Sequence, residues 1–241
     1  IYGNYINKID MMIFMNKKIK YDLVLKNGSV VLPDGIKIVD IGILNESIKD
    51  IGDLSGSDTH DSIDCSGLHV LPGVIDSQVH FREPGLENKE NLESGMLAAA
   101  AGGVTAVFEM PNTNPLTITP ETIKDKLKRA SRVAWTDYAF YLGGTGRTGP
   151  NLGKWENAPG ICGIKIFMGA STGDLLAASD EEVASVLSNG KRVVAVHAED
   201  QYIMEANMKT ILKDNHDVSL HCKWRSPESC LSATKRVVMI A

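Results

Sequence analysis

From Leu71 onward, short β-branched runs alternate with longer helix-like stretches, and this rhythm limits the possible folds more than any other feature of the sequence. The strand-like runs span residues 74–80, 104–110, 137–142, 161–168 and 192–197. Helices are expected at about 89–101, from Thr119, over 179–188, from about Asp200 and from Ser226. Strands joined by helices pair in parallel, in a doubly wound sheet or in a barrel. Residues 71–241 are therefore predicted to be α/β.

Two of these helices carry clear start signals. Thr119 can cap the first of them, with Pro120 at the favoured first position. Ser179 and Glu182 have the spacing of a capping box, and Gly190 follows the expected end of that helix.

Residues 21–70 have a different pattern, which predicts a small β domain contributing to a sandwich. Short β-branched runs at 21–26, 30–32, 36–44, 47–51 and 63–70 are separated by turn sequences, among them Asn27-Gly28 and a polar loop at 53–61. Residues 1–20 are expected to be a disordered or incidental leader. Their apolar patch at 11–15 precedes its basic segment, and no small-residue cleavage site follows, unlike in a secretory signal.

Composition excludes several classes of protein. The formal net charge of −5 gives no excess of Lys and Arg for a nucleic-acid partner. No run approaches the roughly 18 apolar residues of a membrane span. The four cysteines are scattered without a C-x-x-C pair, which is typical of reduced thiols in the cytoplasm. We therefore expect a cytoplasmic protein with neither nucleic acid nor membrane as partner.

Three residues with ligand chemistry stand at or just inside the carboxyl ends of predicted strands. They are His80, Lys165 and His197. In a (β/α)8 barrel these strand ends line the active site. Neutral imidazole is a good zinc ligand, and a lysine can serve as one once CO2 has converted its amine into a carbamate.

Several segments together resemble the dihydroorotases (class I-like) of the cyclic amidohydrolases in the amidohydrolase superfamily. They are DSQVHFREPG at 76–85, GGVT at 102–105, MPNTNP at 110–115, GIKIFM at 163–168 and HAE at 197–199. The first is similar to the family signature D-x-H-x-H-x-R-x-P-G. The resemblance covers nearly everything from Tyr21 onward, in the expected order. It implies a metal-dependent TIM-type barrel, of which about five of eight strands fit into this length beside the β domain.

The resemblance implies roles residue by residue. His80 corresponds to one of the paired histidines on the first metal, Lys165 to the carboxylated lysine that bridges two metals, and His197 to a ligand of the second metal. One or two Zn²⁺ ions per subunit are therefore expected. Arg82 and Asn112 correspond to the residues that hold the carboxylate of the substrate, a task suited to a guanidinium and an amide.

These roles imply interconversion of dihydroorotate and N-carbamoyl-L-aspartate, a step of de novo pyrimidine biosynthesis. Allantoinases commonly have Asn at the position of Arg82, and hydantoinases usually lack the R-x-P-G element, but both remain alternative interpretations. A homo-oligomer and a complex with aspartate carbamoyltransferase are the protein partners that the family suggests.

The sequence departs from the family pattern in two ways. Gln78 replaces the first His, and an amide oxygen is a weaker zinc ligand than imidazole. The segment that supplies the Asp general base is expected beyond Ala241, so no catalytic base is assigned within the chain. The sequence therefore resembles a C-terminally truncated enzyme, inactive by itself, and a non-catalytic remnant serving as a scaffold is a further alternative.

Other patterns are interpreted as structural. The GTGRTG sequence at 144–149 fits a dinucleotide-binding motif, but a loop composition follows it at 150–153, where that motif needs a helix. Five basic residues are expected on a solvated helix face: Lys124, Lys126, Lys128, Arg129 and Arg132. The remaining histidines, His60, His69, His216 and His221, are expected to have structural or solvated positions.

Overall fold

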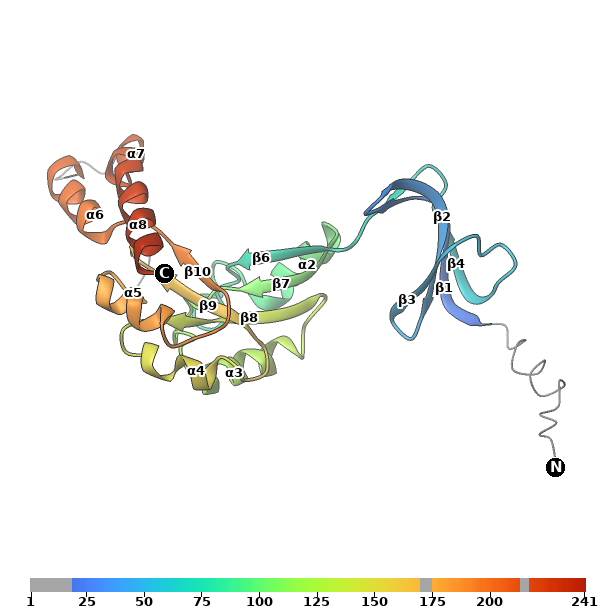
Figure 1. The fold of residues 1–241 in the computed structure, drawn as a ribbon, viewed down its shortest axis with the longest axis horizontal. Helices are drawn as coiled ribbons and strands as arrows, with labels where there is room; N and C mark the ends of the chain where they lie inside the picture. Colours follow the sequence, from blue (N-terminus) through green and yellow to red (C-terminus); the bar gives the residue numbers. More distant parts are fainter. Residues whose placement is uncertain (1–18, 170–174, 213–216) are drawn as a thin grey trace, which may run out of the picture. The chain divides into compact units, whose positions relative to one another are not determined.

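The computed structural model describes residues 19–169, 175–212 and 217–241, which form two compact units divided between Pro72 and Gly73 (Figure 1). The expected leader at 1–20 lies outside the described residues except for its last two positions, and so does His216. The four cysteines are free thiols. Within the described ranges, no helix is both long and apolar enough to cross a bilayer.

The first unit is one five-stranded sheet built around a long central strand, β1 (Lys20–Leu32). Strand β2 (Gly35–Leu44) pairs with β1 in antiparallel fashion, and β3 (Ser47–Gly52) pairs with β2 in the same way. Strands β4 (Asp58–Asp64) and β5 (His69–Val70) both run parallel to β1. The β-rich character expected for this part of the chain is confirmed.

Two local predictions in this unit were wrong. Asn27-Gly28 is not a turn between strands but an irregularity inside β1, where the register with β2 shifts between Leu25 and Gly28. Asn27 has a positive φ of 60°, and its backbone N–H donates to Asp40 Oδ1 at 2.9 Å. The end of the expected loop at 53–61 belongs to β4, because pairing with the distant strand β1 extends it.

The second unit contains a five-stranded parallel sheet in the order β10-β9-β8-β7-β6. Its strands are β6 (Val74–Val79), β7 (Val104–Glu109), β8 (Asp137–Gly144), β9 (Ile161–Phe167) and β10 (Val194–His197). The helices that alternate with the strands are α2 (Leu92–Ala101), α3 (Pro120–Ala130), α4 (Leu152–Trp155) and α5 (Asp180–Leu187). The sheet is half of a barrel, as the sequence predicted, with all neighbouring strands parallel.

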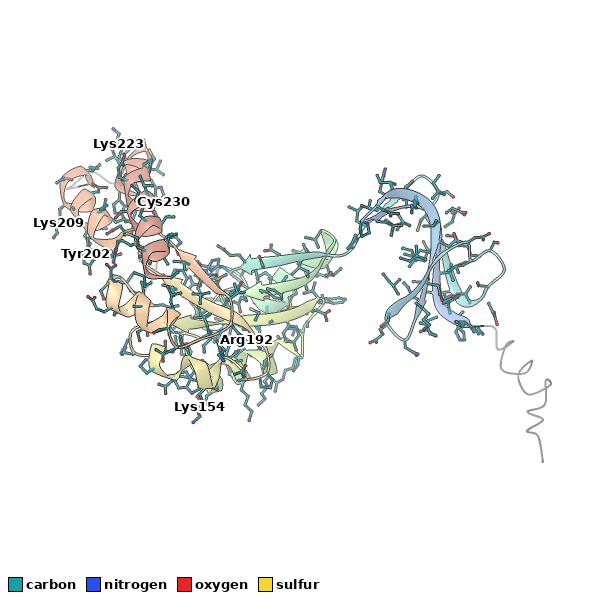
Figure 2. The ribbon with its side chains drawn as sticks, viewed as in Figure 1. Lys154, Arg192, Tyr202, Lys209, Lys223 and Cys230 are labelled. Atoms are coloured by element: carbon teal, nitrogen blue, oxygen red, sulfur yellow. The ribbon has the colours of Figure 1, made fainter. Side chains whose placement is uncertain are left out.

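The chain continues after β10 as a group of short helices and one long one. They are α6 (Gln201–Asn207), the π-helical turn η2 (Met208–Leu212), the 3₁₀ turn η3 (Val218–Leu220), α7 (His221–Trp224) and α8 (Pro227–Ile240). Figure 2 shows Lys209 and Lys223 at the outer end of this group, remote from the sheet.

Helix starts follow the local signals in the sequence. Thr119 and Ser179 both cap their helices through complete capping boxes, although the partner of Thr119 is Thr122 rather than an acid. Helix α2 begins at Leu92, later than the expected Lys89, because Asn91 Oδ1 accepts the backbone N–H of Ser94 at 2.8 Å.

The core of this unit lies between the sheet and its helices. It includes Leu92, Met96, Phe140, Leu142, Ile164, Ile166, Val183 and Val186, all almost completely buried. Side chains alternate along a strand, so Lys165 points to the opposite face from Ile164 and Ile166. That opposite face is the one on which a barrel places its interior.

Candidate functional site

The loops that follow β6 and β7 form one structural element at the carboxyl edge of the sheet. The backbone N–H of Asn114 donates to Pro84 O at 2.9 Å, which joins the REPG and MPNTNP segments. Gly85 has a φ of 89°, and a Cβ at this position would lie 1.9 Å from Asn114 O. Only glycine permits so close an approach with this backbone conformation.

Arg82 and Asn112, the two residues predicted to bind the substrate carboxylate, lie together at this junction. Arg82 has a φ of 63°, a conformation that residues other than glycine rarely adopt and that is concentrated at functional sites. Its Nη1 donates to the backbone carbonyl of Asn112 at 3.3 Å. The Asn112 side chain is buried. The guanidinium is thus tied to the loop that carries its predicted partner.

His80 belongs to the same group, through a contact that sequence reasoning missed. Its Nδ1 lies 2.8 Å from Asn112 Oδ1, and an amide oxygen only accepts, so Nδ1 carries the hydrogen and Nε2 keeps a lone pair. Burial lowers the pKa of His80, and the positive charges of Arg82 and Lys165 lower it further. The neutral ring, oriented by an outer partner, is the state in which imidazole binds a metal.

Lys165 lies in the interior of β9 with only 3% of its surface exposed. Its Nζ sits over the Phe167 ring, 4.9 Å from the centroid. Burial lowers the pKa of its ammonium group. Among the residues that the structure describes, no carboxylate lies within 4.0 Å of this nitrogen. Burial without an anionic partner favours the neutral amine, which is the form that reacts with CO2.

His197 ends β10 and takes part in a charged network. Its Nε2 contacts Glu199 Oε2, and Arg225 Nε donates to Glu199 Oε1 at 2.9 Å. Arg225 Nη2 also contacts Glu199 Oε2 and lies 3.1 Å from His197 Nε2. Burial acts to raise the pKa of Glu199, but hydrogen bonds from Arg225 and His197 outweigh it and hold that pKa low.

Glu199 and Arg225 had no role in the sequence prediction. Glu199 belongs to the HAE segment, and Arg225 directly precedes the helix expected from Ser226. These segments were the available signal, but the contact between them spans 26 residues and depends on the tertiary fold.

Two of the predicted ligands, Lys165 and His197, share one face of the sheet. In the register of β9 with β10, Ala195 pairs with Lys165 and His197 with Phe167, so Lys165 and His197 face the same side. The Phe167 and His197 rings are 5.8 Å apart between centroids. The charge of Lys165 also acts on His80, which places the ends of β6 and β9 in one electrostatic environment.

Imidazole nitrogens and a lysine carbamate are donors that suit zinc. The His, Cys, Asp and Glu side chains of the described residues do not form a complete zinc site by themselves. Across the described residues, no three His, Cys, Asp or Glu side chains gather as a metal site requires. A zinc ion here would therefore need the carbamate form of Lys165 beside the two imidazoles. Gln78, the weak fourth candidate, is exposed, and its backbone N–H donates to Asp76 Oδ1 at 3.0 Å.

The prediction that Lys126 lies on the solvated face of α3 was wrong. Lys126 is completely buried, and its Nζ lies 2.5 Å from Oε2 of Glu109, which is also buried. The reason is the helical spacing, because Lys126 follows the buried Ile123 by three residues and so faces the sheet. Its neighbours Lys124 and Lys128 are exposed, as expected.

The GTGRTG segment packs against a helix. A Cβ on Gly146 would lie 2.8 Å from Glu182 Cγ, and one on Gly149 would lie 2.3 Å from Ser185 Oγ, both of which belong to α5. The expected loop at 150–153 is helical, since the 3₁₀ turn η1 (Gly149–Asn151) leads directly into α4. The glycines thus serve helix packing.

Three of the other histidines are exposed within their own units. His60 and His69 are exposed on β4 and β5 of the first unit. His221 lies on α7 with its ring edge-on to Trp224, 5.8 Å away, which is a local structural contact.

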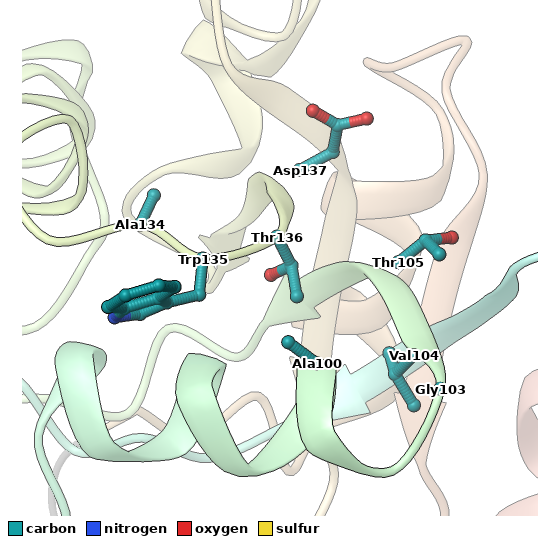
Figure 3. Close-up of a pocket in the computed structure, with 8 residues that line it drawn as sticks. All are labelled: Ala100, Gly103, Val104, Thr105, Ala134, Trp135, Thr136 and Asp137. Carbon is teal, nitrogen blue, oxygen red and sulfur yellow. The ribbon is translucent and has the colours of Figure 1, made fainter. Parts of the chain in front are cut away.

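A surface hollow of about 410 Å³ lies at the amino ends of β7 and β8 (Figure 3). This edge of the sheet is opposite to the carboxyl edge, which carries the candidate site. Val104, Thr105 and Asp137 line it where the strands begin. Chemistry in parallel α/β barrels is carried at the carboxyl ends of the strands. The hollow is therefore set apart from the candidate site.

Comparisons with known proteins show which families this chain is similar to. Residues 67–148 match the family model described as Dihydro-orotase-like. The chain is 35% identical over 202 residues to an allantoinase of Desulfitobacterium hafniense, with 81% of this chain and 44% of the relative covered. It is 34% identical over 212 residues to a dihydroorotase of Methanosarcina acetivorans, with 87% and 45% covered.

Solved structures give the same result for the fold. The L-hydantoinase (dihydropyrimidinase) of Arthrobacter aurescens superimposes with a TM-score of 0.84 at 31% identity, covering 91% of this chain and 50% of that one. The chain spans about half the length of the curated relatives that it matches. It is a homologue of cyclic amidohydrolases whose names cover three different substrates.

Proposed function

We propose that this chain, whose residues 67–148 match the Dihydro-orotase-like family, carries the part of a cyclic amidohydrolase site that selects a ring bearing a carboxylate. The substrate pair is dihydroorotate and N-carbamoyl-L-aspartate. The observation that supports this choice is the Arg82 guanidinium, tied to the Asn112 carbonyl within the element that also orients His80. A guanidinium recognises a carboxylate through paired hydrogen bonds.

The residues of the chain divide the work between them. Arg82 and Asn112 would hold the carboxylate and so fix the ring over His80, Lys165 and His197. These three would hold zinc, with Lys165 as a carbamate and Gln78 as a weak additional donor. Zinc, when bound, would activate water and polarise the ring amide.

The test compares the binding of L-dihydroorotate and dihydrouracil, which share a ring and differ by the carboxylate. Calorimetry with zinc and bicarbonate present measures the two affinities directly. Dihydroorotate should bind at least about tenfold more tightly, since a charged hydrogen bond contributes about 1.5–3 kcal/mol. Arg82→Met should abolish the difference. Equal affinity in the unmodified chain would contradict the proposed substrate.

A second candidate is allantoin or a hydantoin, which relatives named allantoinase and the structural match to an L-hydantoinase support. These rings lack the carboxylate, so Arg82 would have no anionic group to bind. Tighter binding of allantoin than of dihydroorotate, unchanged by Arg82→Met, would favour this candidate.

A further inference from the structure

A buried ion pair lies directly beneath the loops that carry Arg82 and Asn112. Glu109, the last residue of β7, is 1% exposed, and Lys126 of α3 is completely buried. The Lys126 Nζ lies 2.5 Å from Glu109 Oε2 and sits over the Phe140 ring, 4.9 Å from the centroid. Neither residue belongs to the predicted ligand set.

The pair contacts both loops of the candidate site. Lys126 Nζ donates to Met110 O at 3.4 Å, at the start of the segment that leads to Asn112. Against the larger effect of burial, the Arg82 backbone acts to lower the pKa of Glu109, so the carboxyl group lies close to the start of the Arg82 loop. Arg82 is the residue whose φ of 63° has to be maintained by its surroundings. A fixed carboxyl group beside the Arg82 backbone and a fixed donor beneath Met110 would do so.

Stability alone does not explain the pair. Removing two charges from water is costly, and apolar residues of similar volume often serve a fold equally well or better. Both partners also have pKa values shifted by burial toward their neutral forms, that of Glu109 upward and that of Lys126 downward. A costly polar pair under two functional loops is better explained by what it holds in place.

We propose that Glu109 and Lys126 are positioning residues, which fix the backbones of the Arg82 and Asn112 loops in the geometry that receives a carboxylate. The pair acts through these loops and does not touch the substrate. That the loops receive a carboxylate rests on the proposed function, whereas the positioning itself does not.

Hydrogen exchange of the backbone amides tests the positioning directly. The variants are Lys126→Met, the double variant Glu109→Gln/Lys126→Met, and the matched control Lys128→Met on the exposed face of α3. In the double variant, segments 81–86 and 110–117 should exchange at least about tenfold faster, because they open locally, while β9 keeps its protection. The control should exchange like the unmodified chain.

Lys126→Met leaves the buried Glu109 without its partner and can fail to fold. The double variant removes both charged groups, so it keeps the test decisive in that case. Unchanged exchange in both loops of the double variant would overturn the proposal. So would unfolding of the double variant, or equal acceleration in β9, since the pair would then serve the fold as a whole.

A binding experiment separates this proposal from the proposed function. If the loops of the double variant exchange faster, its preference for dihydroorotate over dihydrouracil should fall at least about fivefold. If the loops loosen in a chain that never preferred dihydroorotate, the substrate assignment fails and the positioning stands. If the preference exists and persists with loosened loops, the positioning role is overturned.

Discussion

The two ends of the half-barrel hold their candidate ligand histidines in different ways. At β6 and β7, the neutral ring of His80 is bonded to an amide, beside a tight loop junction at Gly85. At β9 and β10, His197 contacts a carboxylate that an arginine also holds. The His80 ring is held by a hydrogen bond to a neutral amide, and the His197 ring by a contact with charged groups. The same chemical task, orienting an imidazole, thus has two physical solutions in one sheet.

The largest expected effect comes from breaking the packing at the first end with Gly85→Ala. The new Cβ would meet Asn114 O at 1.9 Å in a left-handed backbone, so we expect a loss of about 4 kcal/mol in the free energy of unfolding. Urea unfolding followed by tryptophan fluorescence measures it, because all three tryptophans lie in the second unit.

Gly103→Ala is the matched control for the loop junction. Gly103 has a similar φ of 85° but nothing within 4 Å of a Cβ. Its loss should be only about 1–2 kcal/mol, the backbone cost alone. Equal losses in the two variants would show that the contact between the loops contributes nothing.

A smaller effect is expected when the charged network of the second end is broken by Arg225→Met. Glu199, only 15% exposed in its side chain, would lose its arginine partner, at an expected cost of about 2–3 kcal/mol. Lys223→Met, an exposed neighbour, should change stability by less than about 0.5 kcal/mol. Urea unfolding of both variants at neutral pH checks this, and similar values would argue against a role for charge here.

These local devices differ in how far the sequence predicts them. The capping boxes at Thr119 and Ser179 can be predicted from the sequence because their partners lie only three residues away. The strand-end histidines follow from the βα rhythm and from the family resemblance. By contrast, Asn27-Gly28 has turn chemistry, and only pairing with distant strands makes it an irregularity within β1. In the sequence, Lys126 cannot be told from its solvated neighbours. Its burial follows only from the packed face of α3 and from the contact with Glu109.

The smallest expected effect is an acid sensitivity confined to the region after β10. Burial acts against ionisation of Asp200, but bonds from Ser232 and the charge of Arg236 hold its pKa below the usual 3.8. A carboxyl with a lowered folded pKa stabilises the fold above its unfolded pKa, and this contribution is lost as pH falls below about 3.8.

Arg236→Met should therefore weaken this acid dependence. Urea midpoints at about pH 6 and pH 3 should differ less in this variant than in Lys235→Met, an exposed control on the same helix. An equal difference between the urea midpoints at the two pH values in both variants would show that the acid sensitivity arises elsewhere in the chain.

The central claim is that both ends of the half-barrel serve one metal-dependent site. It is tested most directly by counting the zinc ions retained in the presence of bicarbonate in the unmodified chain, His80→Gln, Lys165→Met and the double variant. If the ends meet at one ion, each single variant should lose that ion, and the double variant should lose no more than either single one. Zinc retention that neither substitution alters, or losses that add in the double variant, would contradict a shared site.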